Sequence, residues 1–195
     1  IQDDIYNHLN DGWDMGIFHP VCTYLTISAE WAYSDVPMIN GKVKRILPGT
    51  LIGKDRVAAR EKALRDVNAL MSVPYPYAIE NPVGVISTRI GKYDQKIQPW
   101  MFGHNASKGT CLWLKDLPVL NATNIVGKGD RTVFASGKSH PKWYADALKK
   151  AKTKQETQTL RSKTLPGIAR AMALQWSDYL LNPDKVNKSL FGEII

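Results

Sequence analysis

The amino-acid sequence predicts an α/β domain with a largely parallel sheet. Short apolar runs that end in a polar turn alternate with longer amphipathic stretches, and this alternation is typical of strands connected through helices. The chain has 195 residues, which is within the usual size of one domain. We therefore expect a single domain over residues 1–195.

Three short apolar runs are the candidate strands, and each precedes a polar turn that contains a proline. They are Met15–Phe18, Tyr77–Ile79 and Cys111–Leu114. Proline ends strand pairing because it has no N–H to donate, and α/β sheets bind ligands just outside the carboxyl ends of their strands. Cys22 and Glu80, which follow the first two runs, are therefore candidate site residues.

Two stretches have the period of amphipathic helices. The first is Asp55–Met71, with Asp55 as the N-cap, Val57 on the apolar face, and Arg56 and Arg60 on other faces. The second follows Pro166, and proline suits the first turn of a helix. Each has an apolar stripe, which predicts packing against a core.

Two other segments lack such a stripe. Thr23–Gly53 mixes aromatic residues with Gly, Pro and Ser, which predicts a long ordered loop of the kind that usually serves function. Residues 128–163 form a polar, basic insertion or helical segment, in which Pro141–Leu160 is expected to be helical and to face solvent. The basic run from Lys138 to Lys163 either follows a DNA backbone or is a solubilising helical face.

Composition narrows the class of protein. The formal net charge of +8 favours a polyanionic partner, of which nucleic acid is the commonest. Cys22 and Cys111 have neither CxxC nor Cys/His spacing, so we expect no disulfide framework, no zinc site and a cytoplasmic location. No stretch approaches the roughly 18 apolar residues of a membrane span, so no membrane partner is expected.

A cysteine and a glutamate at neighbouring strand ends point to chemistry on a flat base. A thiolate is a soft nucleophile for an electron-poor carbon, and its addition to C6 of a cytosine makes C5 nucleophilic enough to take a methyl group. A carboxylic acid in a dry pocket is suited to stabilise N3 during that addition. Cys22 and Glu80 fit these two roles.

Each of these residues also has a structural interpretation. A free cysteine is most often a small buried apolar residue, and we expect this of Cys111, which lies in Leu/Trp sequence. Glu80 could cap a turn, and Asn81 could orient Glu80 or its loop. His19 could shift Cys22 toward its thiolate or be a structural hydrogen-bonding group.

Other candidate contacts come from later in the chain. Lys108 and Arg89 could contact phosphate or the base carbonyl, although a solvated loop charge is the stronger interpretation for Arg89. Trp100, Phe102 and Trp113 could stack on a flipped base, but core packing is the expectation for each.

Several segments resemble motifs of the cytosine-5 DNA methyltransferases, in the order found in that family. His19–Cys22 resembles their Pro-Cys motif, Ala78–Pro82 their Glu-Asn-Val motif, and Ser162–Pro166 their closing Gly-Asn-Ala-Val-Pro motif. Small phage and prophage DNA methylases are more similar still, and they share segments that correspond here to His19–Leu25, Ile79–Pro82, Gln98–Gly103 and Cys111–Lys115.

The resemblance implies a Rossmann-like methyltransferase domain that methylates C5 of cytosine in DNA with S-adenosylmethionine, in the host cytoplasm if phage-encoded. Cys22 would be the nucleophile and Glu80 the residue at N3. The implied cofactor contacts are Asp4, Pro20, Thr164 and Leu165, and the implied substrate or DNA contacts are Asn81, Lys108 and Arg89.

The sequence departs from the family pattern in ways that leave other functions open. The Gly-containing first strand of the cofactor site is absent, so a missing N-terminal segment or a second chain would have to complete that site. Val21 and Pro82 also differ from the family motifs, and no large target-recognition domain follows Lys115. The alternatives are a non-catalytic DNA-binding remnant of the fold and C5 modification of a free pyrimidine nucleotide.

Overall fold

The computed structural model describes residues 3–135, 137–162 and 165–182. These residues form two compact units. Unit 1 consists of Ile1–Gln95 and Thr110–Asp116, and unit 2 of Lys96–Gly109 and Leu117–Ile195. The described part of the chain contains a four-stranded sheet and five α-helices, so the predicted α/β class is confirmed.

The main sheet has the strand order β1-β4-β6-β5. Its strands are β1 (Gly16–Phe18), β4 (Tyr77–Pro82), β6 (Thr110–Lys115) and β5 (Gln95–Ile97). The first three correspond to the predicted strands, but β4 does not end at Ile79: Glu80, Asn81 and Pro82, predicted to form a turn, continue the strand and pair with β6. β1 and β4 are parallel, whereas β4 and β6 are antiparallel.

The sheet is therefore mixed rather than largely parallel, and the connections explain why. A parallel return needs a crossover of a dozen or more residues, usually a helix. The 19-residue helix α1 (Gly53–Met71) lies between β1 and β4 and supplies one. Between β4 and β6 the chain forms the four-residue helix α2 (Ile86–Arg89), β5 and the 3-10 helix η4 (Pro99–Met101), none of which is a long crossover helix, and β6 pairs with β4 in the antiparallel direction.

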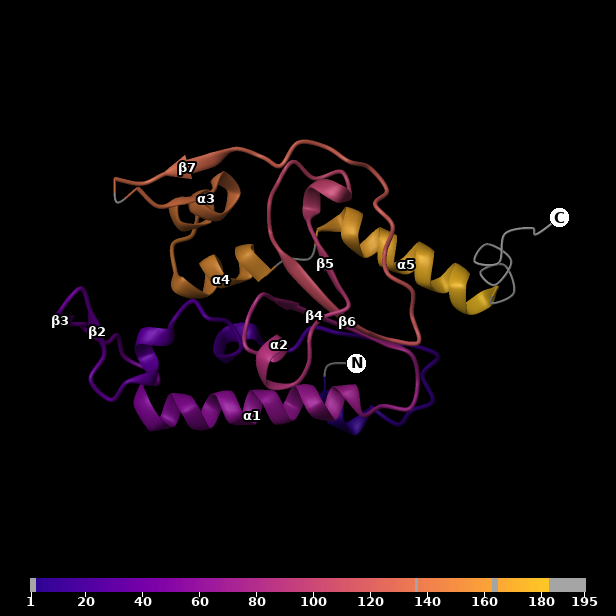
Figure 1. Ribbon diagram of the computed structural model, residues 1–195, viewed down its shortest axis with the longest axis horizontal. Coiled ribbons are helices and arrows are strands. Elements are labelled where there is room, and N and C mark those ends of the chain that lie inside the picture. Colours follow the sequence, from indigo (N-terminus) through magenta and orange to yellow (C-terminus); the bar gives the residue numbers. More distant parts are fainter. Residues whose placement is uncertain (1–2, 136, 163–164, 183–195) are drawn as a thin grey trace. The chain divides into compact units, whose positions relative to one another are not determined.

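Helix α1, the long purple helix in Figure 1, differs in two respects from its predicted form. It begins at Gly53 with Ile52 as the N-cap, so Asp55 lies in the first turn and is not the cap. The buried face includes Arg56 and Arg60, which the sequence had placed on other faces, while Val57 is 43% exposed. The helix thus packs two arginines inward at its N-terminal half.

The segment between β1 and α1 is ordered and contains four short elements. They are the 3-10 helices η2 (Cys22–Tyr24) and η3 (Glu30–Tyr33) and the antiparallel strands β2 (Met38–Ile39) and β3 (Lys42–Val43). A further 3-10 helix, η1 (Ile5–Asn7), precedes β1. The ordered loop was predicted, but its hairpin was not.

The core of unit 1 lies between the sheet and α1. It is made of apolar side chains from both, among them Phe18, Leu25, Leu64, Val67, Leu70, Ile79, Ile86, Cys111 and Trp113. Cys111 is fully buried, in agreement with its predicted structural role. Burying such side chains is the main favourable term in holding a sheet against a helix.

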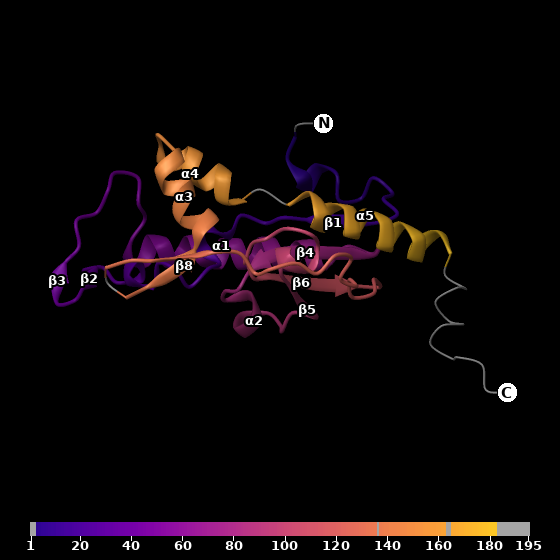
Figure 2. The same ribbon diagram turned by 90° about the horizontal axis from the view of Figure 1, so that it is seen from above.

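Unit 2 is built mainly from helices. It contains η4 (Pro99–Met101), the hairpin strands β7 (Arg131–Val133) and β8 (Ser139–Pro141), and the helices α3 (Lys142–Lys150), α4 (Lys154–Ser162) and α5 (Pro166–Leu181). Figure 2 shows α3 and α4 side by side, and they are in contact.

The helical stretch predicted for Pro141–Leu160 is thus two helices. Thr153 separates them because its Oγ1 accepts a hydrogen bond from the Glu156 N–H at 3.1 Å, which is an N-cap interaction. The helix predicted after Pro166 is confirmed as α5, with Trp176 buried and its Nε1 donating to the Pro118 carbonyl at 2.9 Å.

Within the described ranges, no helix has both the length and the apolar character needed to cross a membrane.

Candidate active site

The polar segment that follows β1 lies beside the carboxyl end of β4. Phe18 is the register partner of Ile79, so the chains continue with His19 beside Glu80 and Pro20 beside Asn81. His19 Nδ1 lies 3.1 Å from Glu80 Oε2, and Asn81 Nδ2 donates a hydrogen bond to the Pro20 carbonyl at 2.9 Å. These contacts join the segment that carries Cys22 to the segment that carries Glu80.

Glu80 presents a buried carboxylate oxygen at this end of β4. Its side chain is only 12% exposed. The contact with His19 lacks the alignment of a hydrogen bond, so Glu80 Oε2 is buried without a hydrogen-bond partner among the described residues, and the same is true of Asn81 Oδ1. A buried polar atom without a partner costs free energy and is rare in folded proteins. Two such acceptors on adjacent residues mark this end of β4 as a place where a ligand or water would bind.

Cys22 begins the 3-10 helix η2, directly after this joined pair of turns. Its carbonyl accepts hydrogen bonds from the N–H groups of Leu25 at 3.0 Å and Thr26 at 3.1 Å, which fixes the turn. The thiol is free, and the residue is partly exposed. The preceding residue, Val21, is 73% exposed. Cys22 is therefore held by its backbone, and the residue as a whole is partly exposed.

The arginines of α1 hold the chain that follows Cys22. Arg60 donates to the carbonyl of Tyr24 at 2.9 Å and to that of Thr26 at 3.3 Å, and it also pairs with Glu30 at 2.7 Å. Arg60 is 9% exposed, and its guanidinium lies 3.7 Å from the centroid of the Tyr33 ring. Its hydrogen bonds compensate for the burial of the charge.

Arg56 makes a weaker set of contacts one turn earlier in α1. It is 6% exposed, and its hydrogen bond to the Thr23 carbonyl is long, at 3.4 Å. The guanidinium lies 5.3 Å from the Tyr24 ring centroid and 5.0 Å from that of Tyr33, within the range of a cation–π interaction. The two arginines together attach the η2 turn to the helix.

A close backbone approach connects the two turns a second time. Val85 N–H donates to the Leu25 carbonyl at 2.8 Å, and Thr26 forms an isolated β-bridge with Gly84. A Cβ atom at Gly84 would lie 2.0 Å from the Leu25 oxygen. Only glycine fits at position 84 without displacing the chain that follows Cys22.

The other predicted site residues of unit 1 lie in different settings. Asp4 is the exposed N-cap of η1, where its Oδ1 accepts from the Tyr6 N–H at 3.1 Å. Arg89 is 49% exposed and pairs with Glu61 of α1 at 2.8 Å, which agrees with a solvated charge. Neither residue contacts Cys22 or Glu80 through a hydrogen bond or ion pair described in the structure.

Three predicted residues lie outside unit 1. Lys108 belongs to unit 2, where its backbone N–H donates to Gln98 Oε1 at 3.0 Å. Leu165, also in unit 2, is the N-cap of α5. Thr164 lies outside the described residues.

The aromatic residues largely follow their structural interpretation. Phe102 and Trp113 are buried, and the Trp113 Nε1 donates to the Gly91 carbonyl at 2.7 Å. Trp100 is partly buried, with the Lys128 Nζ 5.5 Å from its ring centroid. Core packing is therefore confirmed for Phe102 and Trp113.

Sequence reasoning missed Arg56, Arg60 and Gly84. The helical spacing contained a signal for the arginines, because positions 56, 60, 64 and 67 fall on one face of a helix. Gly84 follows Asn81-Pro82-Val83, and a glycine just after a strand end can indicate close backbone approach. Among the described residues, no group of three His, Cys, Asp or Glu side chains is placed to hold a metal ion.

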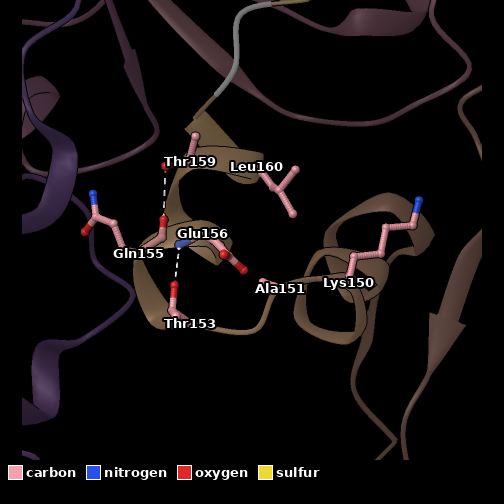
Figure 3. Close-up of a pocket in the computed structure, with 7 residues that line it drawn as sticks. All are labelled: Lys150, Ala151, Thr153, Gln155, Glu156, Thr159 and Leu160. Carbon is pink, nitrogen blue, oxygen red and sulfur yellow. Dashed lines mark hydrogen bonds between the residues drawn. The ribbon is translucent and has the colours of Figure 1, made fainter.

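A separate hollow of about 460 Å³ lies within unit 2 on the α3–α4 pair (Figure 3). It is lined by Lys150, Ala151, Thr153, Gln155, Glu156, Thr159 and Leu160. The hydrogen bonds drawn there are helix-internal: Glu156 N–H donates to Thr153 Oγ1, and Thr159 Oγ1 donates to the Gln155 carbonyl. The hollow contains no residue that the sequence predicted for a site.

No protein-family model matches the chain, and neither a curated protein nor a solved structure matches it.

Proposed function

We propose that the protein methylates C5 of cytosine in DNA, with Cys22 as the nucleophile and Glu80 as the group at N3. The observation that carries the proposal is the pair of contacts between the strand ends, His19 with Glu80 and Pro20 with Asn81. These contacts bring the segment that carries Cys22 next to the buried carboxyl group of Glu80, at the carboxyl ends of β1 and β4. Ligands of α/β sheets bind at such strand ends.

The residues support a defined order of events. The Cys22 thiolate would form a bond from Sγ to C6 of the base, and the displaced electron pair would be accommodated at N3 by a proton from the Glu80 carboxyl group. C5 would then take the methyl group. Loss of the C5 proton to water, release of Sγ as the thiolate and return of the N3 proton to Glu80 would restore the aromatic ring and both side chains to their starting states.

The proposed methyl donor is S-adenosylmethionine, but the described residues fit only a part of it. Asp4 is exposed and could accept a hydrogen bond from an adenine amino group. The Pro20 carbonyl is already engaged by Asn81, Leu165 belongs to unit 2, and Thr164 is not described. The residues predicted to hold the cofactor thus do not come together as one set in unit 1, and no step above depends on them.

The fold is consistent with a Rossmann-like methyltransferase domain in one respect that matters for the site. β1 and β4 are parallel neighbours with the helix α1 in their crossover, which is the βαβ unit of that class. Glu80 lies near the carboxyl end of β4, and Cys22 comes shortly after the end of β1. We propose that the mixed sheet is a part of such a domain.

A methyl-transfer assay on variants of the two cysteines tests the proposed function. DNA is incubated with S-adenosylmethionine labelled in its methyl group, and incorporation is compared for wild type, Cys22→Ser and Cys111→Ala. We expect Cys22→Ser to abolish incorporation and Cys111→Ala, a buried apolar replacement, to retain it. Glu80→Gln is expected to lower the rate by about 100-fold or more. Full methylation by Cys22→Ser would refute the proposal.

Two further measurements separate the alternative functions. A non-catalytic remnant would show no calorimetric binding of S-adenosylmethionine and no incorporation into any substrate. An enzyme for free nucleotides would label dCMP and leave DNA unlabelled. We expect incorporation into DNA and none into dCMP.

A further inference from the structure

The β2–β3 hairpin exposes apolar side chains to an unusual degree. Its strands are short, with Met38 opposite Val43 and Ile39 opposite Lys42. Met38 is 52% exposed, Ile39 39% and Val43 69%. Exposed apolar residues that gather in one place, unlike scattered ones, commonly mark an interaction site.

All charged residues of this hairpin are basic. Positions 36–47 contain Lys42, Lys44 and Arg45 and no acidic residue, although unit 1 as a whole contains slightly more acidic than basic residues. Lys42 and Arg45 are exposed. A surface that is both apolar and positively charged is complementary to nucleic acid, whose phosphates are negatively charged and whose stacked bases have apolar faces.

The turn gives the hairpin a defined shape. Asn40 and Gly41 have φ values of 51° and 75°, the left-handed conformations that a two-residue hairpin of this type requires. Lys44 N–H donates to the Pro37 carbonyl at 2.9 Å below the strands. In Figures 1 and 2 the hairpin lies beyond the end of α1 at which the helix begins.

Contacts within unit 1 connect the base of the hairpin to the turn of Cys22. Asp35 Oδ1 accepts from the Lys54 N–H of α1 at 3.3 Å, and the Lys44 Nζ lies 4.4 Å from the Trp31 ring centroid. In the same η3 helix, the Tyr33 hydroxyl donates to the Tyr24 carbonyl at 3.1 Å. The hairpin and the η2 turn are therefore held on one scaffold.

We infer that the β2–β3 hairpin is a DNA-binding ribbon that enters the duplex beside the target base. Lys42 and Arg45 contact phosphates, and the Met38 and Val43 side chains fill the space left in the stack by the flipped cytosine. The inference rests on the proposed function for the identity of the base. Two-stranded ribbons fit DNA grooves, and apolar wedges are used to separate base steps.

The experiment measures binding of the full chain to mixed-sequence duplex DNA, intact or with one abasic site, by fluorescence anisotropy over a range of salt concentrations. Lys42→Ala/Arg45→Ala is expected to reduce the slope of log K against log [salt] by about 2, because each phosphate contact contributes about 0.9. Lys54→Ala/Arg65→Ala, which removes two exposed cations from α1, is the matched control and should leave the slope unchanged.

The apolar face has its own test. Met38→Ser/Val43→Ser is expected to weaken binding to the abasic duplex about tenfold, with a smaller effect on the intact duplex. Val57→Ser, at an exposed position of α1, is the control. Near-ultraviolet circular dichroism establishes that each variant is folded.

A measurement on the wild-type chain needs no variant. Met38 is exposed, whereas Met15, Met71, Met101 and Met172 are partly or fully buried. Hydrogen peroxide should oxidise Met38 first, and duplex DNA should slow that oxidation, as read by mass spectrometry. Unprotected Met38 together with an unchanged salt slope would overturn the inference, as would preferential binding of the hairpin to vesicles of anionic lipid.

The outcomes distinguish this inference from the proposed function. Methylation by Cys22→Ser would refute the catalytic proposal and leave the hairpin's effect on DNA binding as it was measured. Wild-type binding by both hairpin variants would refute the ribbon and leave the catalytic proposal intact.

Discussion

Asn81 is the residue whose side chain most directly fixes the candidate active site. It is 2% exposed, and its amide donates to the carbonyl of Pro20 across the two strand ends. Asn81→Ala removes this hydrogen bond, which is one of the contacts that attach the turn carrying Cys22 to β4. The same substitution also deletes Asn81 Oδ1, a buried acceptor without a partner, which partly offsets the loss.

We expect Asn81→Ala to lower the free energy of unfolding by about 1–2 kcal/mol. Denaturation in urea measures the change. Asn68→Ala, at an exposed position of α1, is the control and should change stability by less than about 0.5 kcal/mol. A loss as small as that of the control would show that the Pro20 hydrogen bond does not hold the turn.

His8 makes the segment before β1 sensitive to pH. Its Nδ1 lies 2.7 Å from Asp11 Oδ2 and its Nε2 lies 3.3 Å from Asp3 Oδ2. The hydrogen bond to Asp11, with a smaller contribution from Asp3, raises the pKa of His8 above its ordinary value. The protonated ring therefore stabilises the segment at pH values below the unfolded pKa of about 6.5. This stabilisation is lost as the pH rises through the folded pKa.

An NMR titration of the His8 ring tests this effect. Asp11→Asn should lower the pKa of His8, and Asp3→Asn should lower it less, because its hydrogen bond is the weaker of the two. The reverse order, or no change in Asp11→Asn, would contradict the geometry.

At the scale of elements, Gly84 controls how closely β4 approaches the chain after η2. A Cβ atom there would overlap the backbone oxygen of Leu25. Gly84→Ala is expected to destabilise the protein by about 1–3 kcal/mol, because backbone rather than a flexible side chain must move. Gly91→Ala is a matched control, since a Cβ atom at Gly91 meets nothing within 4 Å.

Thermal unfolding followed by circular dichroism measures both glycine variants. The methyl-transfer rate should fall in Gly84→Ala under conditions in which the variant is folded, because the displaced segment contains the Cys22 turn. A Gly84→Ala protein as stable and as active as Gly91→Ala would show that the close approach is not needed.

The sequence predicted an element correctly where a single local pattern, such as an apolar run or a proline in the first turn of a helix, is enough to form it. β1, β4 and β6 correspond to the three predicted apolar runs, and α5 begins at Pro166 as expected. The β2–β3 hairpin was missed although Asn40-Gly41 is a strong hairpin signal. Its exposed apolar strands lack the alternation of a half-buried strand, and this obscured the signal.

The sequence predicted only that part of the candidate site which depends on the order of the strands in the sheet. Cys22 and Glu80 were expected to follow two neighbouring strands; β1 and β4 are neighbours, but Glu80 lies within β4. The contribution of Arg56 and Arg60 depends on the carbonyls of a loop that folds back on α1. An arginine in a sequence predicts an exposed charge by default, and only the fold of the loop supplies the acceptors that allow burial.

At the scale of the whole molecule, the positive charge is unevenly divided. Unit 2 contains 15 Lys and Arg against 6 Asp and Glu, while unit 1 contains 11 against 12. The net charge of +8 therefore comes entirely from the sequence of unit 2. Non-specific attraction of a polyanion depends on such charge.

Removing charge from unit 2 should therefore weaken DNA binding at low salt. Lys149, Lys150 and Lys152 are exposed, and their joint replacement by Gln is expected to reduce the slope of log K against log [salt] by up to about 2.7. Anisotropy titrations measure the slope. Replacement of Lys62, Arg65 and Lys92 of unit 1 by Gln removes the same charge and should have the smaller effect; equal effects would argue against a DNA-binding role for unit 2.

The hydrogen bond from Asn81 to Pro20 also determines which positions can vary during evolution. Its donor is a side chain, so residue 81 must remain an amide, but its acceptor is a main-chain carbonyl that any residue supplies. Val21, 73% exposed between this acceptor and Cys22, can thus change without disturbing the attachment of the turn. Substitutions at position 21 can therefore change the surface next to Cys22 while the backbone of Cys22 keeps its place.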